Sequence, residues 1–229
     1  MERTARHLVF ATIAAGVVLG SVRGLSTDYL PFKLSIGTAY ASLGFLSAAL
    51  LVGPLRVLRG GVHPTSTHFR RDLGIWAGLL GVTHVIVGLQ VHAPGKPWEY
   101  FVWPAGQSRL LPLRYDLFGL ANHVGLLLTA LLVLLLGLSN DASLRRLGAG
   151  RWKRLQRTTY FAFGLLAVHG IAYVEMERRV WPWALLLAVP VGLVTVLQLL
   201  GTGYHSRPRG LLAPRDEGDR RAAGPAPQL

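Results

Sequence analysis

The 229-residue sequence contains no cysteine. Disulfides, iron–sulfur clusters and the covalently attached heme of a C-x-x-C-H motif all need cysteine, so each of them is excluded. Any redox cofactor must therefore be held without thiolates. Acidic residues are also scarce, with 11 Asp and Glu against 24 Lys and Arg, and charged residues make up only 15% of the chain. A chain so poor in charge, and 51% hydrophobic, is typical of an integral membrane protein.

The apolar residues are gathered into long runs that short basic segments separate. These runs lie at residues 8–21, 34–55, 73–91, 117–138, 158–174 and 180–201. All but the first approach the ~20 residues that a helix needs to cross a bilayer, and the first is interpreted as a tilted or irregular helix. The expected fold class is an all-α integral membrane protein, with a six-helix transmembrane bundle in residues 1–203.

The distribution of Lys and Arg predicts how this bundle is oriented. If the N-terminus is cytoplasmic, 17 of the 24 basic residues fall in cytoplasmic segments, as the positive-inside rule requires. Both termini are then cytoplasmic. The net charge of +13 is explained by topology, and no nucleic-acid partner is expected, because the basic residues mark the ends of apolar runs instead of gathering on one folded face.

Two polar segments lie outside the predicted spans. Residues 204–229, rich in Arg, Pro, Gly and Ala, are expected to form a disordered cytoplasmic tail. Residues 92–116 carry four prolines among aromatic residues, so a continuous helix is not expected there. This longest external segment is interpreted as a lid or docking surface along the outer interface, with an ordinary amphipathic loop as the alternative.

Two histidines lie inside apolar runs at the same depth. His84 is eleven residues after Leu73, and His169 is eleven residues after Thr158, so each lies roughly 16 Å from the cytoplasmic end of its helix. Both helices run from inside to outside, and the two imidazoles are therefore expected to meet near the membrane centre. Histidines from two helices can supply both axial ligands of a b-type heme. Hydrogen-bonded histidines or a proton relay are the alternatives.

Three more residues belong to this candidate site. Gly81 and Gly88 lie on the same helix face as His84, where a missing side chain would let a flat ring approach, and close helix packing is the alternative. His123 is roughly 9 Å from the outer end of its helix, shallower than His84. It is a rival ligand, a contact to the heme edge or propionates, or a partner of Asn122.

The remaining histidines are not assigned to the site. His92 falls near the outer surface and is interpreted as interfacial, and on that side Arg109 and Arg114 could neutralise heme propionates. The other histidines lie in or beside predicted cytoplasmic segments, and each is expected to be an ordinary solvated residue: His7, His63, His68 and His205.

Several segments resemble the ferric-reductase-like transmembrane family. The resemblance rests on the run RRDLGIW at 70–76 leading to His84, on the turn LSND at 138–141 followed by LRRLG at 144–148, and on RWKRL at 151–155 leading to Tyr160 and His169. Within that family the segments are most similar to the heme-binding membrane subunit of bacterial periplasmic methionine-sulfoxide reductase systems. The resemblance implies a multi-pass protein of the bacterial inner membrane in which six helices bind b-type heme through His84 and His169.

The resemblance also bears on the number of hemes. The subunit's usual Leu-His pair before the tyrosine is Leu155-Gln156 here, and glutamine is a poor iron ligand. One heme is therefore expected, without a second near the cytoplasmic face. The implied role is that of an electron-transfer subunit of an oxidoreductase system, which passes electrons from the cytoplasmic side to an outer acceptor such as a methionine-sulfoxide reductase or ferric iron.

The electron donor is expected to be a separate molecule. No glycine-rich nucleotide fingerprint lies between a strand and a helix, so the candidates are a quinol from the bilayer and a cytosolic flavin reductase, with quinone or FMN as further cofactors.

Two other functions stay open. The chain could be a non-redox membrane subunit or transporter in which His84 and His169 relay protons or join helices, or a heme enzyme with its own substrate site, which two axial histidines disfavour because they leave the iron no open position.

Overall fold

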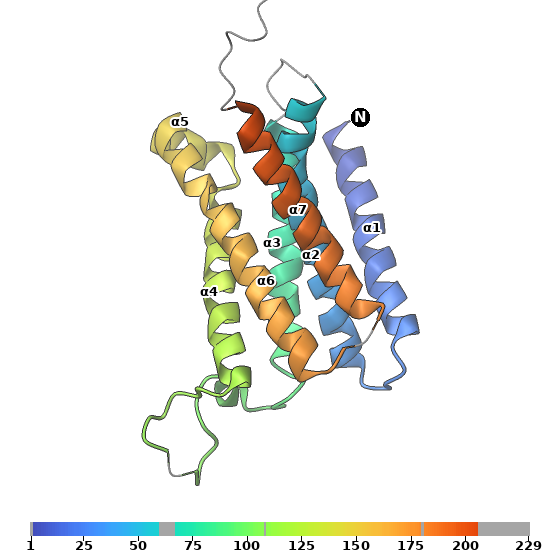
Figure 1. The fold of residues 1–229 in the computed structure, drawn as a ribbon, viewed down its shortest axis with the longest axis vertical. Helices are drawn as coiled ribbons and strands as arrows, with labels where there is room; N and C mark the ends of the chain where they lie inside the picture. The colour runs from blue at the N-terminus through green and yellow to red at the C-terminus, as the bar shows by residue number, and fades with distance from the viewer. Residues whose placement is uncertain (1, 60–66, 108, 180, 206–229) are drawn as a thin grey trace, which may run out of the picture.

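The computed structural model describes residues 2–59, 67–107, 109–179 and 181–205, which form a helical bundle (Figure 1). Residue 63 and residues 206–229 lie outside this range, so the predictions for His63 and for most of the tail are not addressed by it. The helices are α1 (Arg3–Gly24), α2 (Leu30–Leu58), α3 (Thr67–Gly88), the short 3-10 helix η1 (Pro97–Tyr100), α4 (Leu117–Leu138), α5 (Asp141–Gln156), α6 (Thr158–Met176) and α7 (Trp183–His205).

The long helices run side by side along the bundle, and the first and last of them begin and end at the same end of the molecule (Figure 1). Five helical segments are long and apolar enough to cross a membrane: Arg3–Gly24, Leu30–Leu58, Leu117–Leu138, Asp141–Met176 and Trp183–Gly201. The described residues are thus all-α, as the apolar runs predict, and they fit a multi-pass membrane protein.

The surface of the bundle is apolar where a soluble protein would be polar. Large apolar side chains point outward from different helices, with Leu19 on α1 53% exposed, Ile171 on α6 59% exposed and Leu199 on α7 67% exposed. An extended exposed apolar surface marks a region that another apolar phase covers. Here it surrounds the long helices, as a lipid-facing surface does.

Helix α3 is not among the five apolar segments because charged residues lie near its start. It packs against both α2 and α4 and so tolerates polar groups that lipid would not. Its Asp72 is completely buried, and the carboxylate pairs with Arg6 at 2.5 Å and with Arg3 at 3.2 Å, both from α1. His7, expected to be solvated, accepts a hydrogen bond from Trp76 Nε1 at 3.0 Å beside this carboxylate.

Helix α5 is a feature that the apolar runs did not predict. It lies at the same end of the bundle as the start of α1 (Figure 1), and none of its residues is buried. Asn140 caps it by accepting from the Ser143 amide at 2.8 Å. Its Trp152 Nε1 donates to the Leu138 carbonyl at 2.9 Å, satisfying one of the free carbonyls at the end of α4.

The segment between α3 and α4, predicted to be external, packs in part against the opposite end of the bundle. Tyr100 is 2% exposed, and its hydroxyl donates to the Gly88 carbonyl at 2.7 Å and accepts from the His92 amide at 2.8 Å. Asp116 caps α4 through the Gly119 amide and pairs with Arg114 at 2.9 Å. The segment is therefore tied to the helix ends on both sides, while Leu110 at its tip is 95% exposed.

The buried Asp72 cluster predicts a large effect on stability. Replacing Asp72 with Ala leaves the Arg6 guanidinium, which is 14% exposed, without its main partner, and we expect a loss of roughly 3 kcal/mol or more in the free energy of unfolding. Denaturant unfolding in detergent, followed by circular dichroism, measures this loss. The control is Lys96→Ala, which removes the pair between Glu99 and the exposed Lys96 ammonium and should cost far less. Equal losses in both variants would contradict the prediction.

Candidate functional site

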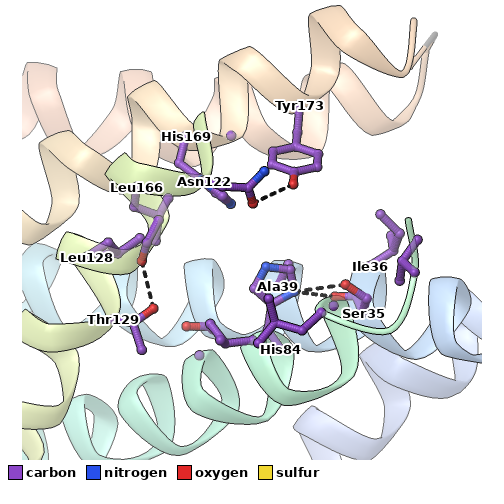
Figure 2. A pocket seen from close by; sticks show the side chains of 18 of the residues that line it. Ser35, Ile36, Ala39, His84, Asn122, Leu128, Thr129, Leu166, His169 and Tyr173 are labelled. Atoms are coloured by element: carbon purple, nitrogen blue, oxygen red, sulfur yellow. Dashed lines mark hydrogen bonds between the residues drawn. The ribbon is translucent and has the colours of Figure 1, made fainter. Parts of the chain in front are cut away.

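A cavity of about 230 Å³ lies inside the bundle between α2, α3, α4 and α6 (Figure 2). Most of its lining side chains are apolar, among them Ile36, Leu128 and Leu166. Polar groups lie at a few points only, and two of these are the predicted pair His84 and His169. A mostly apolar cavity with a few convergent polar groups is the usual form of a cofactor site.

The structure brings His84 of α3 and His169 of α6 together across this cavity. Their ring centroids are 6.3 Å apart, and the ring planes are at 77°. Figure 2 shows the two rings on opposite sides of the open space. The sequence predicts that the two side chains lie at the same level along their helices. In the structure α3 and α6 are also rotated so that both side chains face the cavity.

Each imidazole is held through its Nδ1 atom. His84 Nδ1 lies 3.0 Å from the Ser35 carbonyl oxygen, and His169 Nδ1 lies 2.9 Å from the Ala121 carbonyl oxygen. Because a carbonyl only accepts, each Nδ1 carries the proton and each Nε2 presents a lone pair. In the described part of the chain, neither Nε2 has a hydrogen-bond partner. This is the arrangement in which a backbone carbonyl orients a histidine toward a metal.

The donor set fits heme better than a bare metal ion. A metal–imidazole bond is about 2 Å long, so two imidazoles on opposite sides of one ion have ring centres about 6 Å apart. Among the described residues, no group of three or more His, Asp or Glu side chains is placed to hold an ion. Two imidazoles alone suit an iron whose other ligands are porphyrin nitrogens, and the apolar walls suit the body of the ring.

The two predicted glycines line the cavity and also lie at close helix contacts. A Cβ atom on Gly81 would come within 2.7 Å of Leu132 Cδ1, and one on Gly88 would come within 3.2 Å of Ser35 Oγ. Both glycines therefore lie at the cavity, as predicted, and both also lie at close contacts between helices, as the alternative held. Neither function excludes the other, since close packing of α3 against its neighbours shapes the cavity wall.

Gly125 is a site residue that the sequence reasoning missed. A Cβ atom there would lie 2.8 Å from His169 Cε1 and 2.9 Å from His169 Nδ1, so the missing side chain makes room for the imidazole. The only sign of this in the sequence is a glycine within a leucine-rich run. Only the contact between α4 and α6 shows which side chain the glycine faces.

His123 is not brought to the histidine pair. Its Nδ1 bonds to the Gly119 carbonyl of its own helix at 2.6 Å, and its ring packs against Phe101 at 5.7 Å, outside the cavity lining. The bond between His123 and Asn122, which was one of the alternatives, is not among the hydrogen bonds of the described residues. Instead, Asn122 accepts from the Tyr173 hydroxyl at 2.9 Å, next to His169 (Figure 2).

The end of the cavity beside the C-terminal end of α6 carries a cluster of three residues joined by hydrogen bonds. Glu177, just after α6, lies 3.4 Å from His92 Nε2 through Oε1 and 2.7 Å from Arg179 Nε through Oε2. Burial raises the pKa of the Glu177 carboxyl, but the hydrogen bonds from His92 and Arg179 outweigh this and hold the pKa below its ordinary value. The carboxylate therefore stays ionised at neutral pH.

The two arginines expected near the propionates lie elsewhere. Arg114 is engaged by Asp116 and by the Glu99 carbonyl, and Arg109 lies over the Trp103 ring at 4.7 Å. Neither lines the cavity. His92, interpreted as interfacial, does line the cavity.

Comparison with known proteins links the chain to heme-binding membrane subunits. It is similar to proteins named protein-methionine-sulfoxide reductase heme-binding subunit MsrQ from Brucella ovis, Brucella canis and Brucella suis. Each is 28% identical over 176 residues, which are 77% of this chain and 71% of the relative. No family model matches the chain, and no solved structure matches it. The relatives support the resemblance to this subunit, whereas membership of the wider ferric-reductase-like family stays a prediction.

The contact between Gly125 and His169 predicts that an added methyl group is not tolerated. In Gly125→Ala the imidazole, held by the Ala121 carbonyl, would have to move, and we expect a lower midpoint of thermal unfolding in detergent. The control is Gly164→Ala on α6, where a Cβ atom meets nothing within 4 Å and alanine favours the helix. A Gly125→Ala variant as stable as the control would contradict the prediction.

The ionised Glu177 predicts a specific dependence of stability on pH. Because its folded-state pKa is lowered, its contribution to stability is present above the ordinary value of about 4.3 and is lost as the pH falls through the folded-state pKa. Glu177→Gln should therefore lose less stability than the unmodified protein over that acidic range. Thermal unfolding at a series of pH values measures this. The exposed Glu175→Gln is the control and should follow the unmodified protein.

Proposed function

We propose that this chain is a membrane-embedded b-type heme protein that transfers electrons as one subunit of an oxidoreductase system. The observation that carries the proposal is the pair His84 and His169, with ring centroids 6.3 Å apart and both Nε2 atoms turned away from their backbone partners. The similarity to relatives named as heme-binding subunits supports it independently.

The protein crosses a bacterial inner membrane six times, with both termini in the cytoplasm. The sixth span is α3, which is less apolar because it packs between α2 and α4 and is less exposed to lipid. Support for this orientation comes from the 17 of 24 basic residues that it places on the cytoplasmic side. Further support is that the basic helix α5 lies at the same end of the bundle as the start of α1 (Figure 1), so both basic segments fall on one side of the membrane.

Heme, when bound, supplies one-electron chemistry that the side chains lack. His84 and His169 would hold its iron, and the Ser35 and Ala121 carbonyls keep the two rings oriented and raise the basicity of Nε2. The apolar wall excludes water and so helps to set the reduction potential. Two protein ligands leave no position for a substrate, which favours electron transfer over catalysis at the metal.

A single heme is expected for each chain. Gln156 ends α5 and lies thirteen residues before His169, about 20 Å along a helix. An amide side chain is a poor ligand for iron, so a second heme at the cytoplasmic end is not part of the proposal.

The electron donor is a quinol from the bilayer or a cytosolic flavin reductase, with quinone or FMN as the carrier. The acceptor lies on the outer side, and the names of the relatives favour a protein-methionine-sulfoxide reductase, with ferric iron as another candidate. Electrons would then cross from the cytoplasmic end of the bundle to the outer end, where the cavity carries its charged residues.

The test is an absorption spectrum of the protein purified in detergent, oxidised and then reduced with dithionite, with heme quantified per chain. We expect a b-type spectrum and about one heme per chain. His84→Ala and His169→Ala should each lose most of the heme. The exposed His68→Ala is the control, and His123→Ala tests the rival ligand; both should keep it. A colourless protein after expression with ample heme would overturn the proposal and favour a non-redox membrane subunit.

A further inference from the structure

The charges that line the cavity are gathered at one end. Of the described lining residues, Glu177 and Arg179 are the two with side chains charged at neutral pH, and both follow the outer end of α6. The middle of the cavity, between His84 and His169, is walled by apolar side chains. The cavity therefore suits an amphiphilic ligand with an apolar body and a charged group at its outer end.

Arg179 is built into this outer end. Its side chain is 16% exposed, and its Nε donates to Glu177 Oε2 at 2.7 Å. The guanidinium also lies beside the Tyr40 hydroxyl of α2. A guanidinium has five N–H donors in a planar fork, more than one carboxylate oxygen and one hydroxyl can satisfy. Such a fork is well suited to binding a further carboxylate.

His92 is held next to Arg179 by the same carboxylate. Its Nε2 lies 3.4 Å from Glu177 Oε1, and its ring packs on Phe118 and Tyr173, with centroids 5.4 and 6.2 Å away. Its backbone amide donates to the buried Tyr100 hydroxyl. Glu177 thus joins two nitrogen donors that come from different segments of the chain.

We propose that Arg179, with His92 beside it, binds a carboxylate of the ligand in the cavity, and that Glu177 is the positioning residue that holds both donors. The inference rests on the proposed function: if the ligand is heme, the carboxylates are its propionates. The ring then has one orientation, with its acidic edge toward the outer end of the bundle. Arg109 and Arg114 do not take part, because neither lines the cavity.

The experiment compares two ligands that share the porphyrin ring and the iron and differ in whether the two carboxylates are free or methyl-esterified. The full-length protein, produced without heme and purified in detergent, is titrated with hemin and with hemin dimethyl ester, whose propionates are neutral, and the absorption spectrum reports binding. We expect the unmodified protein to bind hemin more tightly than the ester. In Arg179→Gln the affinity for hemin should fall roughly tenfold to a hundredfold, while that for the ester stays unchanged. The control is Arg178→Gln, an exposed neighbour outside the cavity lining.

The outcomes separate this inference from the proposed function. If the unmodified protein binds neither ligand, the proposed function is wrong. If it binds hemin and the ester equally, or if Arg179→Gln keeps the preference for hemin, the inference is overturned and heme binding stands. If Arg179→Gln binds neither ligand, Arg179→Lys, which keeps the positive charge, is tested in its place. We expect Arg179→Lys to bind hemin more tightly than the ester. If Arg179→Lys binds the ester but no longer prefers hemin, the inference is overturned.

Discussion

The site depends on two hydrogen bonds between an imidazole and a backbone carbonyl. A histidine inside an apolar bundle must satisfy its N–H group, and His84 and His169 do so at Ser35 and Ala121, on the neighbouring helices α2 and α4. Each bond fixes a tautomer and leaves the other ring nitrogen, with its lone pair, on the side of the ring away from the carbonyl. The close approach of α4 to α6 at Gly125, and of α3 to α2 at Gly88, is what brings those carbonyls within reach.

The polar groups of the bundle are divided between its two ends. At the end that carries the start of α1, Asp72 of α3 forms ion pairs with Arg3 and Arg6 of α1, and the basic helix α5 lies exposed. At the other end, Glu177 joins Arg179 to His92, which belongs to the segment between α3 and α4. The apolar middle holds the histidine pair. The two ends of the bundle therefore differ in charge and in the elements that carry it.

Helix α3 shows why mean hydropathy alone can miss a membrane-spanning helix at the centre of a bundle. Its charged start and His84 lower its apolar character, yet these side chains face protein: Asp72 is completely buried and His84 bonds to Ser35. The partners needed for burial come from α1 and α2, which are distant in sequence. The helices at the periphery have no such neighbours on their outer faces, so they are the more apolar ones.

The all-α class and the depth of the histidines could be predicted from the sequence, because the length of an apolar run and the rise of a helix are local quantities. Rotation about a helix axis and the identity of neighbours depend on packing, and only the tertiary structure decided these. It turned His169 into the cavity and His123 onto Phe101, although both lie in apolar runs. It also set Gly125 against His169 and brought Arg179 to the cavity in place of Arg109 and Arg114. The spacing of residues along one helix carries no information about which side chains of a neighbouring helix they will contact.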